Sequence, residues 1–257
     1  MRDPDEGVGS GGTIVTGVAR SRVPAAFEPV VRAAVDAVGA VDGASAYLYG
    51  SVATGRARVG ASDVDVLPVG VDRAAALRLG RELSARFREV CRGVELAPLA
   101  PGDLLGESDE AYGNRVFLRH YSVHLTGPDV AAGLPAYPAD ARAARGFNGD
   151  IGRDLELWRA ALDAGDDARR LGRRVARKTL LAVAGIVSVH DRTWTTDREL
   201  AARRWATVDP ARAAGLATLL AWSDGSSVPA AAAVRTALDT TVAPVAATFA
   251  ALVGLWE

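Results

Sequence analysis

The sequence has a single cysteine, a single lysine and no apolar run long enough to cross a membrane. With only Cys91 present, no disulfide can form within the chain, and a metal site made of cysteines is excluded. Spanning a bilayer takes ~20 consecutive apolar residues, and the N-terminus also lacks the basic-then-apolar pattern of a signal peptide. We therefore expect a cytoplasmic protein that does not contact membranes.

An excess of positive charge is also missing. Lysine and arginine together number 30, aspartate and glutamate 31, and the formal net charge is −1. A general nucleic-acid binder needs clustered, uncompensated basic side chains, so this balance argues against that class. It favours a small molecule or a protein as the partner. We expect a monomer or a weak dimer.

The chain is long enough for one large domain or two small ones. It has 257 residues, of which 49% are hydrophobic, and this is ample for a packed core. A folded globular protein is expected.

The stretch from Tyr47 to Val69 carries the clearest functional pattern in the sequence. An aromatic-rich run ends at Gly50-Ser51, a polar loop follows, and a second apolar run carries Asp63 and Asp65. Both runs are predicted to be strands. Because alternate strand residues share a face, the two aspartates should lie on one side and Val64 and Val66 on the other.

Two carboxylates on one face repel each other unless a cation lies between them. Mg²⁺ is typically held by one or two carboxylates together with substrate phosphate oxygens. The Gly50-Ser51 turn offers backbone N–H groups that could meet a phosphate closely. Asp63, Asp65 and this turn together fit nucleotidyl transfer.

These residues resemble the signature of the polymerase-β-type nucleotidyltransferase superfamily, with a slightly longer loop than its usual form. The matching positions are Gly50-Ser51, Gly55, Arg58, Ser62 and Asp63-Val64-Asp65. The resemblance implies that Gly50, Ser51, Arg58 and Ser62 bind the nucleotide. It also implies two Mg²⁺ ions held by the aspartates, with ATP or another NTP as co-substrate.

A third carboxylate is expected on the next strand. Asp72 is a plausible N-cap for a helix that runs to Val90, and the apolar Val94–Leu99 segment follows it. Alternation places Glu95 on the face opposite to its neighbours, and the resemblance makes it the third metal ligand or a general base. His124, on a later apolar run, is interpreted as structural.

Two later segments give a narrower resemblance, to the streptomycin/spectinomycin (aminoglycoside) adenylyltransferases and their uncharacterised relatives. One is Tyr121 to Ala139, with its Gly-Pro and Leu-Pro pairs, and the other runs from Arg177 to Ala206 and contains Ala-Ala-Arg-Arg-Trp-Ala. The implied activity is transfer of AMP from ATP onto a hydroxyl of a small molecule such as an aminoglycoside-type antibiotic, which would confer antibiotic resistance.

We therefore predict an α+β fold, with an N-terminal nucleotidyltransferase domain built on a small mixed sheet and a C-terminal α-helical bundle. Residues 1–22 are expected to be a flexible tail, 23–145 the first domain and 146–257 the bundle. Helical periodicity predicts five helices in the bundle: Ile151 to Leu162, Ala168 to Val189, Asp197 to Ala206, Pro210 to Leu220 and Val228 to Trp256.

The chain departs from these relatives where they commonly carry Ser-Lys before the tryptophan-containing helix. Here the residues are Thr196-Asp197-Arg198, and Gly185 stands where a basic residue might be expected. This puts NTP affinity in doubt. Arg198, Lys178 or Arg177 could replace the missing lysine at the phosphates.

The acceptor is expected in the cleft between the two domains, a favoured place for small-molecule sites. Asp150, Asp154 and Glu156 could attract a cationic acceptor there, with Trp158 as a flat wall. Two alternatives stay open. The acceptor could be a protein or tRNA, or the protein could be a nucleotide-binding regulator with impaired catalysis.

Overall fold

A four-stranded mixed sheet forms the centre of the N-terminal half of this α+β protein. The computed structural model describes residues 3–256. In the sheet the strand order is β5-β4-β3-β6, with bounds β3 Ser45–Tyr49, β4 Asp63–Val69, β5 Gly93–Leu96 and β6 Ser122–Thr126. β4 and β5 are parallel, and the other two pairs are antiparallel. The predicted small mixed sheet is thus confirmed.

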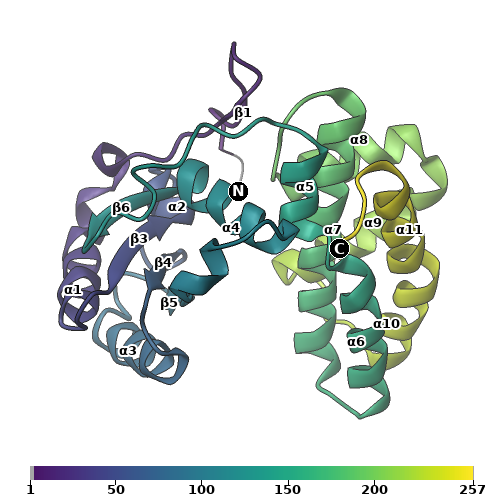
Figure 1. The fold of residues 1–257 in the computed structure, drawn as a ribbon. Coiled ribbons are helices and arrows are strands. Elements are labelled where there is room, and N and C mark those ends of the chain that lie inside the picture. Colours follow the sequence, from purple (N-terminus) through teal and green to yellow (C-terminus); the bar gives the residue numbers. More distant parts are fainter. Residues whose placement is uncertain (1–2, 257) are drawn as a thin grey trace.

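Helices flank this sheet and connect its strands (Figure 1). Their bounds are α1 Glu28–Gly39, α2 Gly50–Ala53, α3 Arg73–Arg86 and α4 Asp109–Tyr121. As predicted, Asp72 caps α3, because its side chain accepts a hydrogen bond from the Ala75 N–H at 3.0 Å. The crossover through α3 brings β5 back parallel to β4.

The C-terminal half is a helical bundle, shown on the right of Figure 1. Its helices are α5 Ala141–Asn148, α6 Ile151–Asp163, α7 Ala168–Asp191, α8 Arg198–Val208, α9 Ala213–Asp224, α10 Ala231–Ala237 and α11 Ala243–Leu252. Short 3₁₀ turns complete the chain at Arg20–Arg22, Ala25–Phe27, Pro101–Leu104 and Pro210–Arg212. Three predicted spans agree closely with α6, α7 and α8.

The last predicted helix is shorter than expected and irregular. A π-helical turn, Leu238–Val242, joins α10 to α11, and α11 ends at Leu252, just before Gly254 with φ +95°. Glycine commonly ends a helix in this left-handed conformation. The prediction ran past this point because Trp256 is apolar and fits the helical spacing. In the structure Trp256 lies beyond the helix, and its indole N–H donates to the Arg145 carbonyl at 2.7 Å.

The two largest hydrophobic clusters support the two halves. One cluster packs α1 and α3 against the sheet, with Phe27, Val64 and Val66 fully buried. The other fills the bundle, and Tyr112 and Val116 of α4 belong to it. Trp158, expected as a wall of the acceptor site, is also in this core, at 1% exposure. α4 therefore ties the sheet half to the bundle.

The N-terminal segment differs from the loose tail that the sequence suggested. Residues Gly7–Val8 and Ile14–Val15 form a two-stranded antiparallel ladder, β1 and β2. Ile14 is 2% exposed within the core of the bundle, and its N–H donates to the Tyr137 carbonyl at 3.0 Å. Ile14, one of two adjacent apolar residues in this polar stretch, therefore packs into the core. None of the helices in residues 3–256 combines the length and apolarity needed to cross a bilayer.

Candidate active site

Gly50 places the start of α2 directly against Asp65. It follows the last residue of β3 and has φ +73°, which glycine adopts without strain. A Cβ at this position would overlap the Asp65 carboxylate. The sequence pattern Gly-Ser after a strand therefore brings a backbone turn into contact with an acidic side chain of the neighbouring strand.

The three predicted carboxylates lie on adjacent strands. Val64 and Val66 are fully buried, so Asp63 and Asp65 share the opposite face of β4. Asp65 and Glu95 are register partners in the parallel β4–β5 pair, and in such a pair they share a face. The alternation argued from the sequence thus brings Glu95 beside Asp65.

The electrostatic environment of Asp65 disfavours its charge. Burial, followed by the charges of Glu95 and Asp63, raises the pKa of Asp65 to about 7. Burial, followed by the charges of Asp65 and Glu95, raises the pKa of Tyr49. Accumulated negative charge of this kind is relieved by a cation.

Arg92 supplies that cation to Asp63. Its Nε donates to Asp63 Oδ1 at 3.0 Å, and a second nitrogen contacts Oδ2. Among residues 3–256, no group of three His, Cys, Asp or Glu side chains is arranged to hold a metal ion. The carboxylate oxygens suit Mg²⁺ in donor type, but Mg²⁺ would have to replace Arg92 as the partner of Asp63.

Ser62 and Arg58 shape the loop before β4. The Ser62 hydroxyl accepts a hydrogen bond from the Arg58 N–H at 2.9 Å, and Ser62 is 6% exposed. The Arg58 side chain is exposed. Their proposed contact with a nucleotide stays a prediction.

The two basic residues predicted from the bundle have different surroundings. Lys178 Nζ contacts Asp150 Oδ1 at 2.6 Å and donates to the Phe147 carbonyl at 3.1 Å, so its ammonium group is already engaged. Arg198 begins α8, and burial, then the neighbouring Arg177, lowers its pKa. Arg198 therefore lies near other positive charges, and a bound anion would reduce the repulsion between them.

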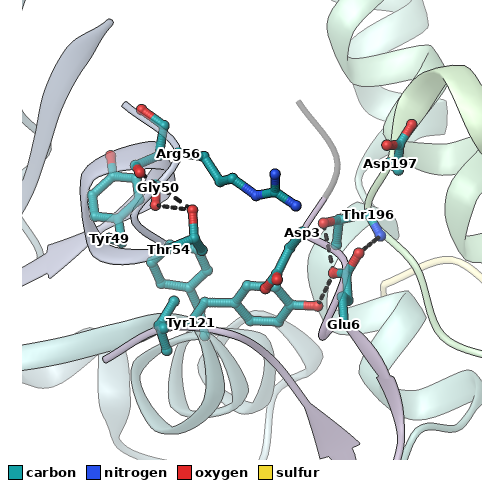
Figure 2. A pocket seen from close by; sticks show the side chains of 12 residues that line it. Asp3, Glu6, Tyr49, Gly50, Thr54, Arg56, Tyr121, Thr196 and Asp197 are labelled. Carbon is teal, nitrogen blue, oxygen red and sulfur yellow. Dashed lines mark hydrogen bonds between the residues drawn. The ribbon is translucent and has the colours of Figure 1, made fainter. Parts of the chain in front are cut away.

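A cavity of about 280 Å³ adjoins the Gly50 turn, and we call it the Gly50 pocket (Figure 2). Tyr49, Gly50, Ser51, Thr54 and Arg56 line one side, and Arg56 extends into the space. The other walls come from elements far away in the sequence: Asp3, Glu6, Val18, Phe117, Tyr121, Thr196 and Asp197. Of the predicted site residues, the pocket contains Gly50 and Ser51.

Glu6 is the best-anchored of the wall residues that sequence reasoning missed. Its carboxylate accepts hydrogen bonds from the Tyr121 hydroxyl at 2.7 Å and from the N–H and hydroxyl of Thr196 at 2.8 and 2.7 Å. The only sequence signal for this contact was the apolar pair Ile14-Val15, which holds the segment in place. Arg56 was missed because the family signature marks its loop neighbours Gly55 and Arg58 but not Arg56 itself.

A second cavity, the aromatic pocket, opens next to the first. It has a volume of about 330 Å³ and shares Phe117, Tyr121 and Thr196 with the Gly50 pocket. Its remaining walls include Phe147, Asn148, Leu181, Gly185 and Trp194. Gly185 also lets α7 pack closely against Phe249, because a Cβ at this position would lie 3.0 Å from the Phe249 ring. Flat rings and a few polar groups suit a planar organic ligand.

No known protein-family signature matches the sequence, and no curated protein matches it significantly. Among solved structures, the fold is similar to that of a spectinomycin adenyltransferase from Enterococcus faecialis, solved with ATP and spectinomycin. The match has a TM-score of 0.54 and 10% sequence identity, and covers 86% of this chain and 98% of the other. The similarity shows that the two proteins share their overall fold across both halves of the chain.

Proposed function

We propose that this protein is a Mg²⁺-dependent nucleotidyltransferase that moves a nucleoside monophosphate, AMP from ATP in the first instance, onto a hydroxyl of a small molecule. The observation that carries this proposal is the meeting of Asp63, Asp65 and Glu95 on adjacent strands beside the Gly50 turn. The nucleotidyltransferase-like fold supports it.

In the proposed reaction the acceptor oxygen attacks the α-phosphorus of the NTP. A new O–P bond forms, the bond from the α-phosphorus to its bridging oxygen breaks, and pyrophosphate leaves. Glu95 would accept the hydroxyl proton, a role worth about 10²–10⁴-fold in rate. Gly50 and Ser51 bind the β- and γ-phosphates from the Gly50 pocket.

Asp63, Asp65 and Glu95 would hold one or two Mg²⁺ ions. The metal would supply neutralisation of the phosphate charge during in-line displacement. The raised pKa of Asp65 is consistent with a side chain whose ionised form needs a bound cation. Arg92 keeps Asp63 neutralised until then.

Mass spectrometry of candidate acceptors tests this function. The protein is incubated with Mg²⁺, ATP or GTP, and a panel of small molecules that includes spectinomycin and aminoglycosides, which the sequence resemblance suggested. We expect at least one panel member to gain the mass of one nucleoside monophosphate. Transfer of label from ATP to protein or RNA instead would contradict the small-molecule acceptor.

One observation favours a second candidate, a nucleotide-binding regulator with impaired catalysis. Asp63 is paired with Arg92, and the described residues hold no ready metal cluster. Such a regulator would bind ATP, measured by calorimetry, without Mg²⁺-dependent release of pyrophosphate. The Asp63→Asn variant would then behave like the wild type in every assay.

A further inference from the structure

Six cationic side chains of α7 line an open groove of about 660 Å³, which we call the arginine groove. They are Arg169, Arg170, Arg173, Arg174, Arg177 and Lys178, and the acidic residue among the lining is Asp167. Residues three, four and eight apart lie along the same side of a helix. The two rows 169-173-177 and 170-174-178 therefore run side by side.

The arginines of this groove lack acidic partners. Within residues 3–256, none of the five forms an ion pair, while most other ion pairs of the chain use an arginine. The Nε atoms of Arg173 and Arg177 are buried without a hydrogen-bond partner. Buried unpartnered donors are rare in folded proteins and call for an explanation. A bound anion would satisfy them.

Like charges crowd one another here. Burial, followed by the nearby Arg173 and Arg92, lowers the pKa of Arg177. The acidic residues expected to attract a cation do not offset this charge, because Asp150 is paired with Lys178. Burial raises the pKa of Asp154, which makes its charge harder to maintain.

The groove is distinct from the place where the donor phosphates are proposed to bind. Gly50 and Ser51 line the Gly50 pocket, and that pocket shares no lining residue with the arginine groove. Arg177, in the groove, is nevertheless near enough to Glu95 and Asp63 for their charges to act on it. The groove therefore lies in the neighbourhood of the candidate carboxylates.

We propose that the arginine groove is the acceptor subsite and that the acceptor is a small molecule bearing phosphate groups. This rests on the proposed function and names its substrate class. From Arg169 to Arg177 the helix rises ~12 Å at ~1.5 Å per residue, a length suited to two or three phosphates. A net charge of −1 over the whole chain disfavours a long polynucleotide.

The organic part of such an acceptor has a neighbouring site. Leu181 lines both the arginine groove and the aromatic pocket, so the two are neighbours. A phosphate ester could therefore place its phosphates on α7 and a ring against Phe147 and Trp194. A polycationic acceptor such as an aminoglycoside would be repelled by the same arginines.

Calorimetry with inorganic triphosphate as the probe tests the groove. The wild type is first saturated with a non-hydrolysable ATP analogue and Mg²⁺, and triphosphate is then titrated. We expect a second binding event that weakens at least tenfold in the triple variant Arg169→Gln, Arg170→Gln, Arg174→Gln. A matched triple variant of exposed arginines, Arg32→Gln, Arg78→Gln and Arg88→Gln, should bind triphosphate as the wild type does.

Three results would overturn the proposal. They are the absence of a second binding event, equal weakening in both triple variants, and loss of ATP-analogue binding in the α7 variant, which would assign the arginines to the donor. The Asp63→Asn variant should lose transfer yet keep triphosphate binding. If the wild type binds triphosphate but transfers nucleotide to no phosphorylated or unphosphorylated acceptor, the proposed function fails and the acceptor role with it.

Discussion

At the scale of single residues, Arg92 contacts Asp63, one of the carboxylates that we propose as metal ligands. Arg92 directly follows Cys91 at the entrance to β5, and its guanidinium is about half exposed while Asp63 is largely covered. An exposed ion pair contributes only about 0.2–1 kcal/mol. Under our proposal, a divalent cation held by several carboxylates would displace Arg92 from Asp63.

Replacing Arg92 should strengthen metal binding. In Arg92→Gln, Asp63 loses its competing cation, so we expect affinity for Mn²⁺ as a Mg²⁺ substitute to rise about two- to fivefold, the equivalent of one exposed ion pair. Electron paramagnetic resonance of free Mn²⁺ measures this. Arg88→Gln, which removes an exposed arginine paired with Glu89, should leave the affinity unchanged. Weaker binding in Arg92→Gln would contradict the metal assignment.

His120 makes folding sensitive to acid. Its Nε2 accepts a hydrogen bond from the Tyr137 N–H at 2.8 Å, which requires the neutral ring. Burial, then the charge of Arg119, lowers the pKa of His120 to about 4. Below pH ~6.5 the unfolded chain takes up a proton that the folded chain does not, so stability falls as the pH drops toward 4.

We expect this loss to be about 1–2 kcal/mol, smaller than the full shift implies because the ring is only half buried. Urea unfolding between pH 7 and pH 4 measures it. In His120→Gln the amide can still accept the Tyr137 N–H but cannot titrate, so the curve should be flatter over this range. A variant with the same slope as the wild type would show that another group causes the acid sensitivity.

At the scale of elements, the turn from β3 into α2 is the most constrained part of the candidate site. Gly50 and Gly60 both have φ +73°, yet a Cβ at Gly60 would meet nothing within 4 Å, whereas one at Gly50 would overlap Asp65. Comparing substitutions at the two glycines therefore distinguishes the effect of backbone strain from the effect of displacing the Asp65 carboxylate.

Alanine at the two positions should have different consequences. Gly60→Ala should cost about 1–2 kcal/mol of stability through its left-handed backbone alone and retain transfer. Gly50→Ala should cost more, and by shifting Asp65 should lower transfer roughly 10²-fold. Thermal unfolding and transfer assays on both variants check this. Equal activity in the two would mean that the contact between Gly50 and Asp65 is not needed for the reaction.

Most elements near the site could be predicted from local patterns. Alternation along β4 was enough to place Asp63 and Asp65 on one face, and a capping aspartate located α3. Other features depend on contacts between distant segments. Nothing local to Arg92 shows that it reaches Asp63, and the polar stretch around Glu6 resembled a disordered tail because its partners, Tyr121 and Thr196, lie more than 100 residues away.

At the scale of the whole molecule, the N-terminal segment binds the two halves together. Ile14 lies in the core of the bundle, Glu6 hydrogen-bonds to residues before α8, and the Ala19 N–H donates to the Ala53 carbonyl next to the sheet at 3.0 Å. The Gly50 pocket is built partly from this segment. Its geometry therefore depends on the segment staying in place.

Truncating Ile14 tests this dependence. Ile14→Ala should cost about 2–5 kcal/mol, as for other fully buried branched side chains. Val15→Ala, whose side chain is 39% exposed, should change stability by no more than about 0.5 kcal/mol. Chemical unfolding of both variants measures the difference. If both are equally stable, residues 3–22 do not contribute to the folded core.

The central claim is that Asp63 and Asp65 serve nucleotidyl transfer. The most direct measurement is Mg²⁺-dependent pyrophosphate release from ATP in the presence of a small-molecule extract that contains phosphate esters, for the wild type, Asp63→Asn and Asp65→Asn. Our account predicts release by the wild type, its loss when Mg²⁺ is chelated, and a fall of at least about 10²-fold in either variant. No release by the wild type, or equal release by Asp63→Asn, would contradict it.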